Sequence, residues 1–168
     1  MSTQPVSIST SKTPSILRRL SGLYCRFKYY AARLDSPFLL LIRLYWGWQF
    51  MTTGWGKLHN LPHVQEFFAS LGIPAPGLMA FAISCLEFFG GILLIVGLAS
   101  RLTGFLLACN MFVAYVTADR EALWSFFKDP GKFYVADPFT FLFISLIVLI
   151  FGAGFFSLDY FFTHRRKR

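Results

Sequence analysis

The stretch Gly77–Ser100, GLMAFAISCLEFFGGILLIVGLAS, decides the fold of this chain. It is apolar over most of its length, and the polar interruptions near its middle are Ser84, Cys85 and a single charge, Glu87. As an α-helix rising about 1.5 Å per residue, it would cover the hydrocarbon thickness of a bilayer, roughly 30 Å. A helix on the surface of a soluble protein would instead repeat a polar face at every turn. The stretch therefore predicts a membrane-spanning helix with a carboxylate near its centre.

The composition of the whole chain agrees with an outer surface that contacts lipid. Of its 168 residues, 55% are hydrophobic and only 14% are charged, whereas soluble domains carry about 25% charged residues. The net charge is +8, but apart from Arg43 the basic residues lie outside the apolar segments or at their edges, and most of them cluster near the two ends. This distribution indicates membrane orientation and argues against a nucleic-acid partner.

Four apolar segments set the predicted architecture. They cover about residues 38–56, 77–98, 102–118 and 138–156, and we expect them to form an all-α, integral membrane four-helix bundle within residues 37–160. A short amphipathic helix is expected in the first long loop, and the turn near Arg101 is short enough to require an antiparallel return of the third segment.

The two ends of the chain differ from this membrane domain. Residues 1–14 are rich in Ser and Thr and predict a disordered tail, and residues 161–168 predict a basic cytoplasmic tail. Residues 15–36 carry five basic residues among Leu, Tyr and Phe, which favours an amphipathic helix on a membrane surface that contains anionic lipid. A solvated basic tail is the alternative. Asp35-Ser36-Pro37 would then cap the start of the first span.

The orientation follows from the Lys and Arg residues on each side of the predicted spans. Eleven fall on the side of the two termini and four on the side of the two long loops, Lys57, Arg120, Lys128 and Lys132. Positively charged loops stay in the cytoplasm. We therefore expect a multi-pass protein with both termini cytoplasmic.

Four polar residues form a candidate intramembrane site. A lone carboxylate in a span costs at least a few kcal/mol, so Glu87 marks a functional or bundle-holding position. Arg43 either pairs with Glu87, directly or through a water, or extends to the lipid phosphates. Gln49 and Asn110 fall at about the depth of Glu87 by helical rise. We therefore predict a site of Arg43, Gln49, Glu87 and Asn110.

Other residue patterns suggest packing rather than chemistry. Gly47 and Gly54 lie on one stripe of the first span with Arg43 and Lys57, and small residues at such spacings indicate close helix contacts. His59 and His63 are four apart, which makes them weak metal candidates, and the intervening Pro62 argues against one regular turn through both. No metal or other cofactor is predicted. Because no histidine lies in a span, transmembrane bis-histidine haem is also not expected.

The combined pattern resembles a known family. It comprises Arg43 early in the first span, Gly54 with Lys57, LGIPAP at 71–76, Glu87 followed by Gly90-Gly91, then Arg101 and the ending DPFTFLFISLIVLIFGAGFFSLD at 137–159. Over about residues 38–160 this is similar to the DoxX family. The resemblance implies a small four-helix protein of the bacterial inner membrane, related to a thiosulfate:quinone oxidoreductase subunit. It also marks Arg43, Gly54, Lys57, Glu87, Gly91 and Arg101 as family-pattern positions.

Two classes of function remain open at this stage. In the first, the chain is a noncatalytic membrane subunit or scaffold that docks a protein partner in a redox or oxidative-stress complex, near a quinone. In the second, it carries a small solute or is coupled to protons through Glu87. Four spans are few for a carrier, so this second function requires a homo-oligomer.

Overall fold

The computed structural model describes residues 15–165. The predicted disordered tail 1–14 and the last three residues of the basic tail 161–168 lie outside the described residues. The chain divides into two compact units, of which one ends at Asp35 and the other begins at Ser36. The first unit contains the beginning of helix α1, which is helical from Ser15 onward.

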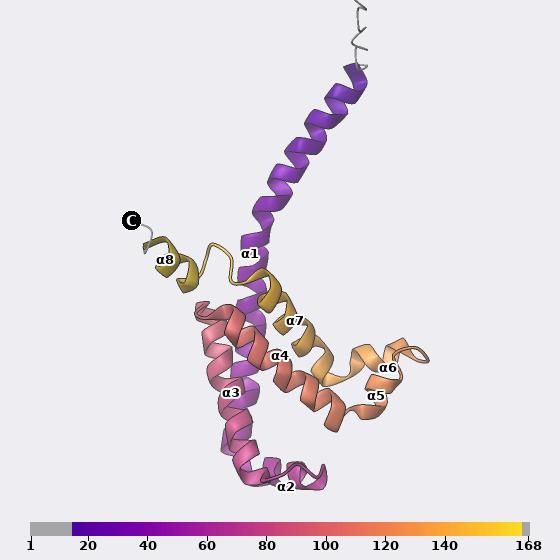
Figure 1. Cartoon of the computed structure of the whole chain (residues 1–168), viewed down its shortest axis with the longest axis vertical. Coiled ribbons are helices and arrows are strands. Elements are labelled where there is room, and N and C mark those ends of the chain that lie inside the picture. The colour runs from indigo at the N-terminus through magenta and orange to yellow at the C-terminus, as the bar shows by residue number, and fades with distance from the viewer. Residues whose placement is uncertain (1–14, 166–168) are drawn as a thin grey trace, which may run out of the picture. The chain divides into compact units, whose positions relative to one another are not determined.

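The described residues form helices joined by turns and loops, and no strand is assigned between residues 15 and 165, which confirms the predicted all-α class (Figure 1). The helices are α1 Ser15–His59, α2 Leu61–Ser70, α3 Pro76–Val96, α4 Ser100–Thr117, α5 Arg120–Trp124, α6 Pro130–Val135, α7 Asp137–Phe151 and α8 Leu158–Arg165.

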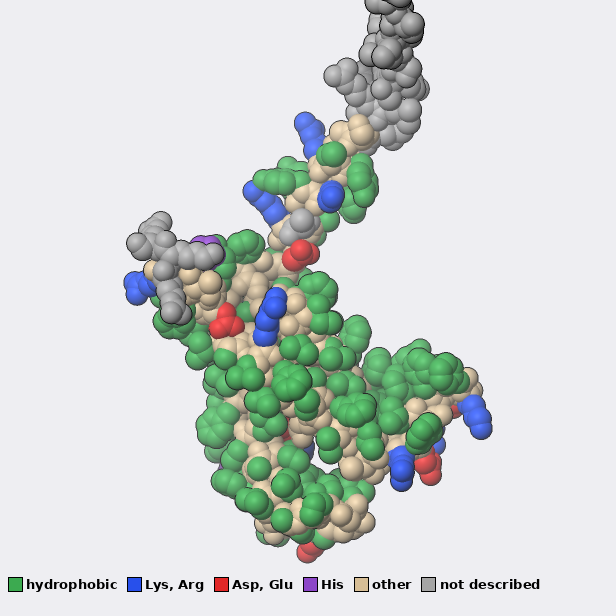
Figure 2. Space-filling view, viewed as in Figure 1, with side chains coloured by type: hydrophobic (Ala, Val, Ile, Leu, Met, Phe, Trp, Pro, Cys, Tyr) green, Lys and Arg blue, Asp and Glu red, His purple; other side chains and the backbone are tan. Residues whose placement is uncertain are grey.

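The second unit is built from the later part of α1 together with α3, α4 and α7. Helix α3 contacts α4, α4 packs along α7, and α2 packs on α3 (Figure 1). Their shared core consists of Phe50, Leu94, Leu107, Met111 and Val148. Hydrophobic side chains cover most of the face of this unit shown in Figure 2, and charged side chains lie near α5 and α6 and near α8.

Glycines allow α1 and α3 to approach closely. A methyl group on Gly54 would collide with the backbone of Phe88, and one on Gly91 would lie 2.5 Å from the carbonyl oxygen of Gly47. Only a residue without a side chain fits at such distances. The predicted close packing at these positions is therefore what the structure shows.

A tight turn reverses the chain between α3 and α4. The backbone N–H of Gly97 donates to Leu93 O at 2.8 Å, and Gly97 takes a φ of 73°, which suits glycine. Asp159 then accepts hydrogen bonds from the backbone N–H groups of Ala99 and Ser100 at 2.7 and 2.8 Å. Its carboxylate satisfies donors that the start of α4 would otherwise leave free.

Two helix ends differ from the expected limits of the first and fourth spans. Helix α1 does not start anew at Pro37 but continues through it, although proline has no backbone N–H to donate. Ser36, the expected cap, instead accepts a hydrogen bond from Phe155 N at 3.3 Å. Helix α7 ends at Phe151 rather than 156, where Gly152 turns to a φ of 76°.

Only α3, among the described helices, is long and apolar enough by itself to cross a membrane. Helix α7 is a shorter apolar helix of 15 residues. Helix α4 has 18 residues, but Arg101, Thr103 and Asn110 lower its hydropathy. The span limits predicted from the sequence remain predictions.

Candidate functional site

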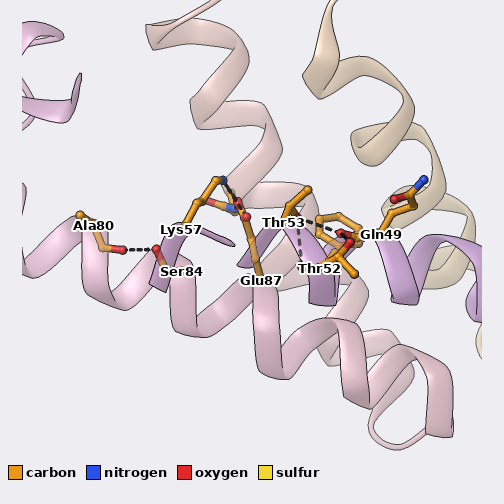
Figure 3. Close-up of polar contacts among 9 residues, drawn as sticks. Gln49, Thr52, Thr53, Lys57, Ala80, Ser84 and Glu87 are labelled. Carbon is orange, nitrogen blue, oxygen red and sulfur yellow. Dashed lines mark hydrogen bonds and ion pairs between the residues drawn. The ribbon is translucent and has the colours of Figure 1, made fainter. Parts of the chain in front are cut away.

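A buried ion pair lies where α1, α3 and α4 meet. Glu87 of α3 is only 1% exposed. Lys57, in the last turn of α1, contacts both carboxylate oxygens of Glu87, with Nζ 2.7 Å from Oε1 and 2.6 Å from Oε2 (Figure 3). Asn110 of α4 donates from Nδ2 to Oε1 at 3.0 Å. The carboxylate of Glu87 thus accepts hydrogen bonds from two other helices.

Glu87 makes the contacts that suit a carboxylate. Both of its oxygens lie within hydrogen-bonding distance of a side-chain nitrogen. Charge-assisted hydrogen bonds of this length are about twice as strong as neutral ones. Since a buried carboxylate without a partner is costly, Lys57 and Asn110 allow Glu87 to remain charged in an apolar helix.

The neighbouring polar group on α3 is satisfied within its own helix. Ser84 lies one turn before Glu87 and donates from Oγ to Ala80 O at 2.6 Å (Figure 3). The hydroxyl hydrogen of Ser84 is therefore donated within α3 and not to Glu87. The buried face of α3 is completed by small and apolar residues, Ala80, Gly90, Gly91 and Leu94.

Arg43 does not pair with Glu87, which corrects the sequence-based hypothesis. Its guanidinium donates to four backbone carbonyls: Leu94 O at 2.9 Å, Ile95 O at 3.2 Å, Phe156 O at 3.1 Å, and Ala153 O. Carbonyls in the last turn of a helix have no partner within the helix and form the negative end of its dipole. Arg43 satisfies two of these at the end of α3. It is 1% exposed, so it does not extend to the lipid phosphates either.

Gln49 also lies away from the ion pair. It is partly exposed, and its Nε2 contacts the hydroxyl of Tyr45 at 3.4 Å. Of the four residues in the predicted polar site, the structure thus brings together Glu87 and Asn110. The partner that the prediction missed is Lys57, which the sequence marked as a family-pattern position. Its place on the same stripe of α1 as Gly47 and Gly54 was the available signal, because that stripe faces α3.

Two cavities contact the ion pair. One, of about 370 Å³, is lined by Lys57, Glu87 and His63 together with apolar residues of α2, α3 and α4 that include Phe67 and Phe68. The other, of about 390 Å³, is lined by the same ion pair with residues of α1, α4 and α7. The Lys57 side chain is 37% exposed, whereas that of Glu87 is buried.

The two candidate metal ligands, His59 and His63, have different surroundings. His63 lines the first cavity, whereas Nδ1 of His59 lies 3.0 Å from Trp55 O and its ring packs on the Trp55 ring. Within residues 15–165 no group of three or more His, Cys, Asp or Glu side chains is gathered as a metal site would require.

The comparisons with known proteins agree with the sequence pattern. The DoxX family profile matches residues 38–120. The chain is 30% identical over 128 residues to a protein of Bacillus subtilis (strain 168) named "Putative oxidoreductase CatD", covering 76% of this chain and 89% of that protein. The chain belongs to the DoxX family. A second DoxX-type relative is "Inner membrane protein YqjF" of Escherichia coli (strain K12), 30% identical over 129 residues, which are 76% of this chain and 93% of that protein. No solved structure matches significantly.

The matched DoxX region contains every family-pattern position, and the structure separates them by role. Lys57 and Glu87 form the ion pair. Gly54 and Gly91 lie in the contact between α1 and α3, and Arg43 binds the carbonyls at the end of α3. The last position, Arg101, lines a separate cavity of about 550 Å³ next to Asp159 and α8.

Proposed function

We propose that this DoxX protein is a four-span protein of the bacterial inner membrane and serves as a noncatalytic membrane subunit of a redox complex. In this role it holds a quinone-type head group beside Lys57 and Glu87, and a partner protein supplies the redox centre. The observation that carries the proposal is the buried ion pair at the wall of an apolar, aromatic-lined cavity.

The membrane part of the proposal rests on length, exposure and relatives. Helix α3 has 21 residues and is long and apolar enough to cross a membrane. Large hydrophobic side chains are exposed along α1, α3, α4 and α7, for example Trp48, Phe81, Phe105 and Phe143, as expected of surfaces that contact lipid. The relative YqjF is named as an inner membrane protein.

The chemistry of the 370 Å³ cavity fits a quinone ring. Its volume lies in the range of small-molecule sites, about 300–1,000 Å³, which are mostly apolar with a few polar groups. A lysine ammonium has three N–H groups, and Glu87 takes two of them in the described structure. The third can donate to a quinone carbonyl, His63 offers a second polar contact, and Phe67 and Phe68 offer apolar surface to the ring.

The redox part of the proposal is supported by the name of one relative. The Bacillus subtilis relative carries the name "Putative oxidoreductase CatD". The residues of this chain offer an ion pair, an amide and a histidine, which can bind and orient a ligand. We therefore assign electron transfer to the partner and ligand positioning to this chain.

The proposal is tested by purifying the protein from its native membrane in a gentle detergent. We expect quinone in the extracted lipids and a co-purifying protein that shows flavin, haem or iron–sulfur absorbance. Glu87→Gln should lose the quinone. Glu121→Gln is the matched control, because Glu121 forms an exposed ion pair with Lys132 at 3.0 Å. Equal quinone in the two variants, or no chromophore-bearing partner, would contradict the proposal.

A carrier function is the second candidate, and one observation favours it. Lys57 and Glu87 line both the 370 Å³ and the 390 Å³ cavity, so one ion pair contacts two separate spaces, as the coupling site of a carrier does. Uptake of radiolabelled organic anions and cations into proteoliposomes decides between the candidates. Uptake that disappears in Glu87→Gln favours the carrier, and the absence of uptake by wild-type protein favours the redox subunit.

A further inference from the structure

The first unit carries an exposed apolar row along its helix. In the part of α1 before Ser36, Leu23, Phe27, Tyr30 and Leu34 recur at spacings of four, three and four residues, which places them on one face. Their side chains are 64%, 70%, 64% and 65% exposed, respectively. We call these four residues the apolar row. Because contiguous exposed apolar surface marks an interaction site, we expect another molecule to cover the apolar row.

Basic residues flank the apolar row. Between residues 15 and 35 the chain has five basic residues, Arg18, Arg19, Arg26, Lys28 and Arg33, and one acidic residue, Asp35. Arg26 and Arg33 are seven apart, so they form a second row beside the first, and both are exposed. Arg33 also lies over the ring of Tyr29, with its Cζ 4.4 Å from the ring centroid.

We propose that the part of α1 before Ser36 lies on the surface of an anionic bilayer, with the apolar row in the acyl boundary and the arginines at the lipid phosphates. A helix with this arrangement binds in the interfacial plane through buried apolar area and attraction to anionic lipid. Arginine can bury its stem while its guanidinium reaches the phosphates, and tyrosine is typical of the same depth.

Charge argues against a second copy of the chain as the occupant. The four- and three-residue spacing would also suit a coiled coil, in which the residues beside the seam normally form ion pairs between helices. Here the row on one side of the seam contains Arg26 and Arg33, and the row on the other side contains Tyr24 and Ala31. A parallel pair would leave the arginines without an acidic partner, and an antiparallel pair would bring them together. An anionic lipid surface supplies the missing negative charge.

The full chain in nanodiscs tests this inference. In one version Cys85 and Cys109 are replaced by Ala, and a fluorophore is attached to the native Cys25, which is exposed and lies on the face opposite the apolar row. In the other version Cys25 is also replaced by Ser, and the fluorophore is attached to Phe27→Cys within the row. Accessibility to an aqueous quencher is measured in phosphatidylcholine alone, in phosphatidylcholine with phosphatidylglycerol, and in neutral detergent.

We expect the label at position 27 to be protected in the anionic nanodiscs only, while the label at position 25 remains accessible. Each basic residue near an anionic surface contributes about fivefold to binding. Arg26→Gln with Arg33→Gln should therefore lower the ratio of bound to free helix roughly 25-fold, and Arg26→Lys with Arg33→Lys should preserve it. Protection that persists in neutral lipid or in detergent, or that rises with protein concentration, would overturn the proposal in favour of a protein occupant. Equal accessibility of both labels in all three media would overturn it as well.

Discussion

Lys57 contacts both carboxylate oxygens of Glu87, across the junction of α1 and α3, at 2.7 and 2.6 Å. The two members differ in exposure, because Glu87 is buried and Lys57 is partly open to the adjoining cavities. Replacing Lys57 should therefore change the stability of the protein by a different amount from replacing Glu87.

The first prediction concerns this inequality. Lys57→Met leaves a buried carboxylate without its cation and should lower the free energy of unfolding by about 3–5 kcal/mol. Glu87→Gln leaves the more exposed ammonium and should cost less, about 1–3 kcal/mol, because solvent screens it. Chemical denaturation in detergent micelles measures both.

The double variant Lys57→Met with Glu87→Gln is the control for coupling. It should recover more than half of the summed loss, because no unpaired charge remains. A double variant that loses the sum of the two single effects would show that the pair is not coupled.

The second prediction separates Arg43 from the ion pair. Arg43→Lys should destabilise the protein by about 2 kcal/mol or more, because one ammonium cannot replace a guanidinium that donates to four carbonyls. Combined with Glu87→Gln, its effect should be additive within about 0.5 kcal/mol, since the two sites share no hydrogen-bond partner. Rescue of Glu87→Gln by a change at Arg43 would restore the pairing hypothesis that the structure contradicts.

The third prediction compares two glycines near the end of α1. Gly54→Ala should destabilise the protein by about 1–3 kcal/mol, because its methyl group would collide with the backbone of α3 at Phe88. Gly56→Ala, two residues further on, meets nothing within 4 Å and should be neutral or stabilising by up to about 1 kcal/mol. Thermal unfolding of the two variants is sufficient, and equal melting temperatures would refute the close contact.

The fourth prediction concerns the proposed topology. Reporter fusions after Ser70 and Pro130 should report a periplasmic location, and a fusion after Arg168 should report a cytoplasmic one, because Lys and Arg accumulate on the side of the termini. A periplasmic signal from the Arg168 fusion would exclude four spans with both ends inside.

The sequence was sufficient for the helical class and for part of the site. The long apolar stretch around Glu87 became α3, and helical rise placed Asn110 at the correct depth to reach it. Depth alone could not show which face of α1 points toward α3, so Gln49 was included wrongly. The rotation of a helix about its axis depends on its packing contacts, and here the glycine stripe determines it.

The assignment of Arg43 failed for a different reason. The prediction considered the attraction of Arg43 to Glu87, the only charge in the second apolar segment. It did not consider the carbonyl oxygens at the end of α3, to which Arg43 donates. Lys57 was missed because the first span was expected to end at residue 56. Helix α1 continues to His59, and this extra turn carries Lys57 onto the face beside Glu87. The path of the chain after Gly152, which supplies the other carbonyls that bind Arg43, had no periodic signal in the sequence.

Direct quinone binding tests the central proposal, that the cavity beside Lys57 and Glu87 holds a quinone-type head group. The purified protein in micelles is titrated with a short-chain ubiquinone analogue by calorimetry, together with His63→Phe and His59→Phe. His63 lines the cavity and His59 contacts Trp55 instead. We expect saturable binding, unchanged in His59→Phe and about fivefold weaker in His63→Phe, as the loss of one hydrogen bond of about 1 kcal/mol implies. No binding by wild-type protein, or identical affinities in the two histidine variants, would contradict this account.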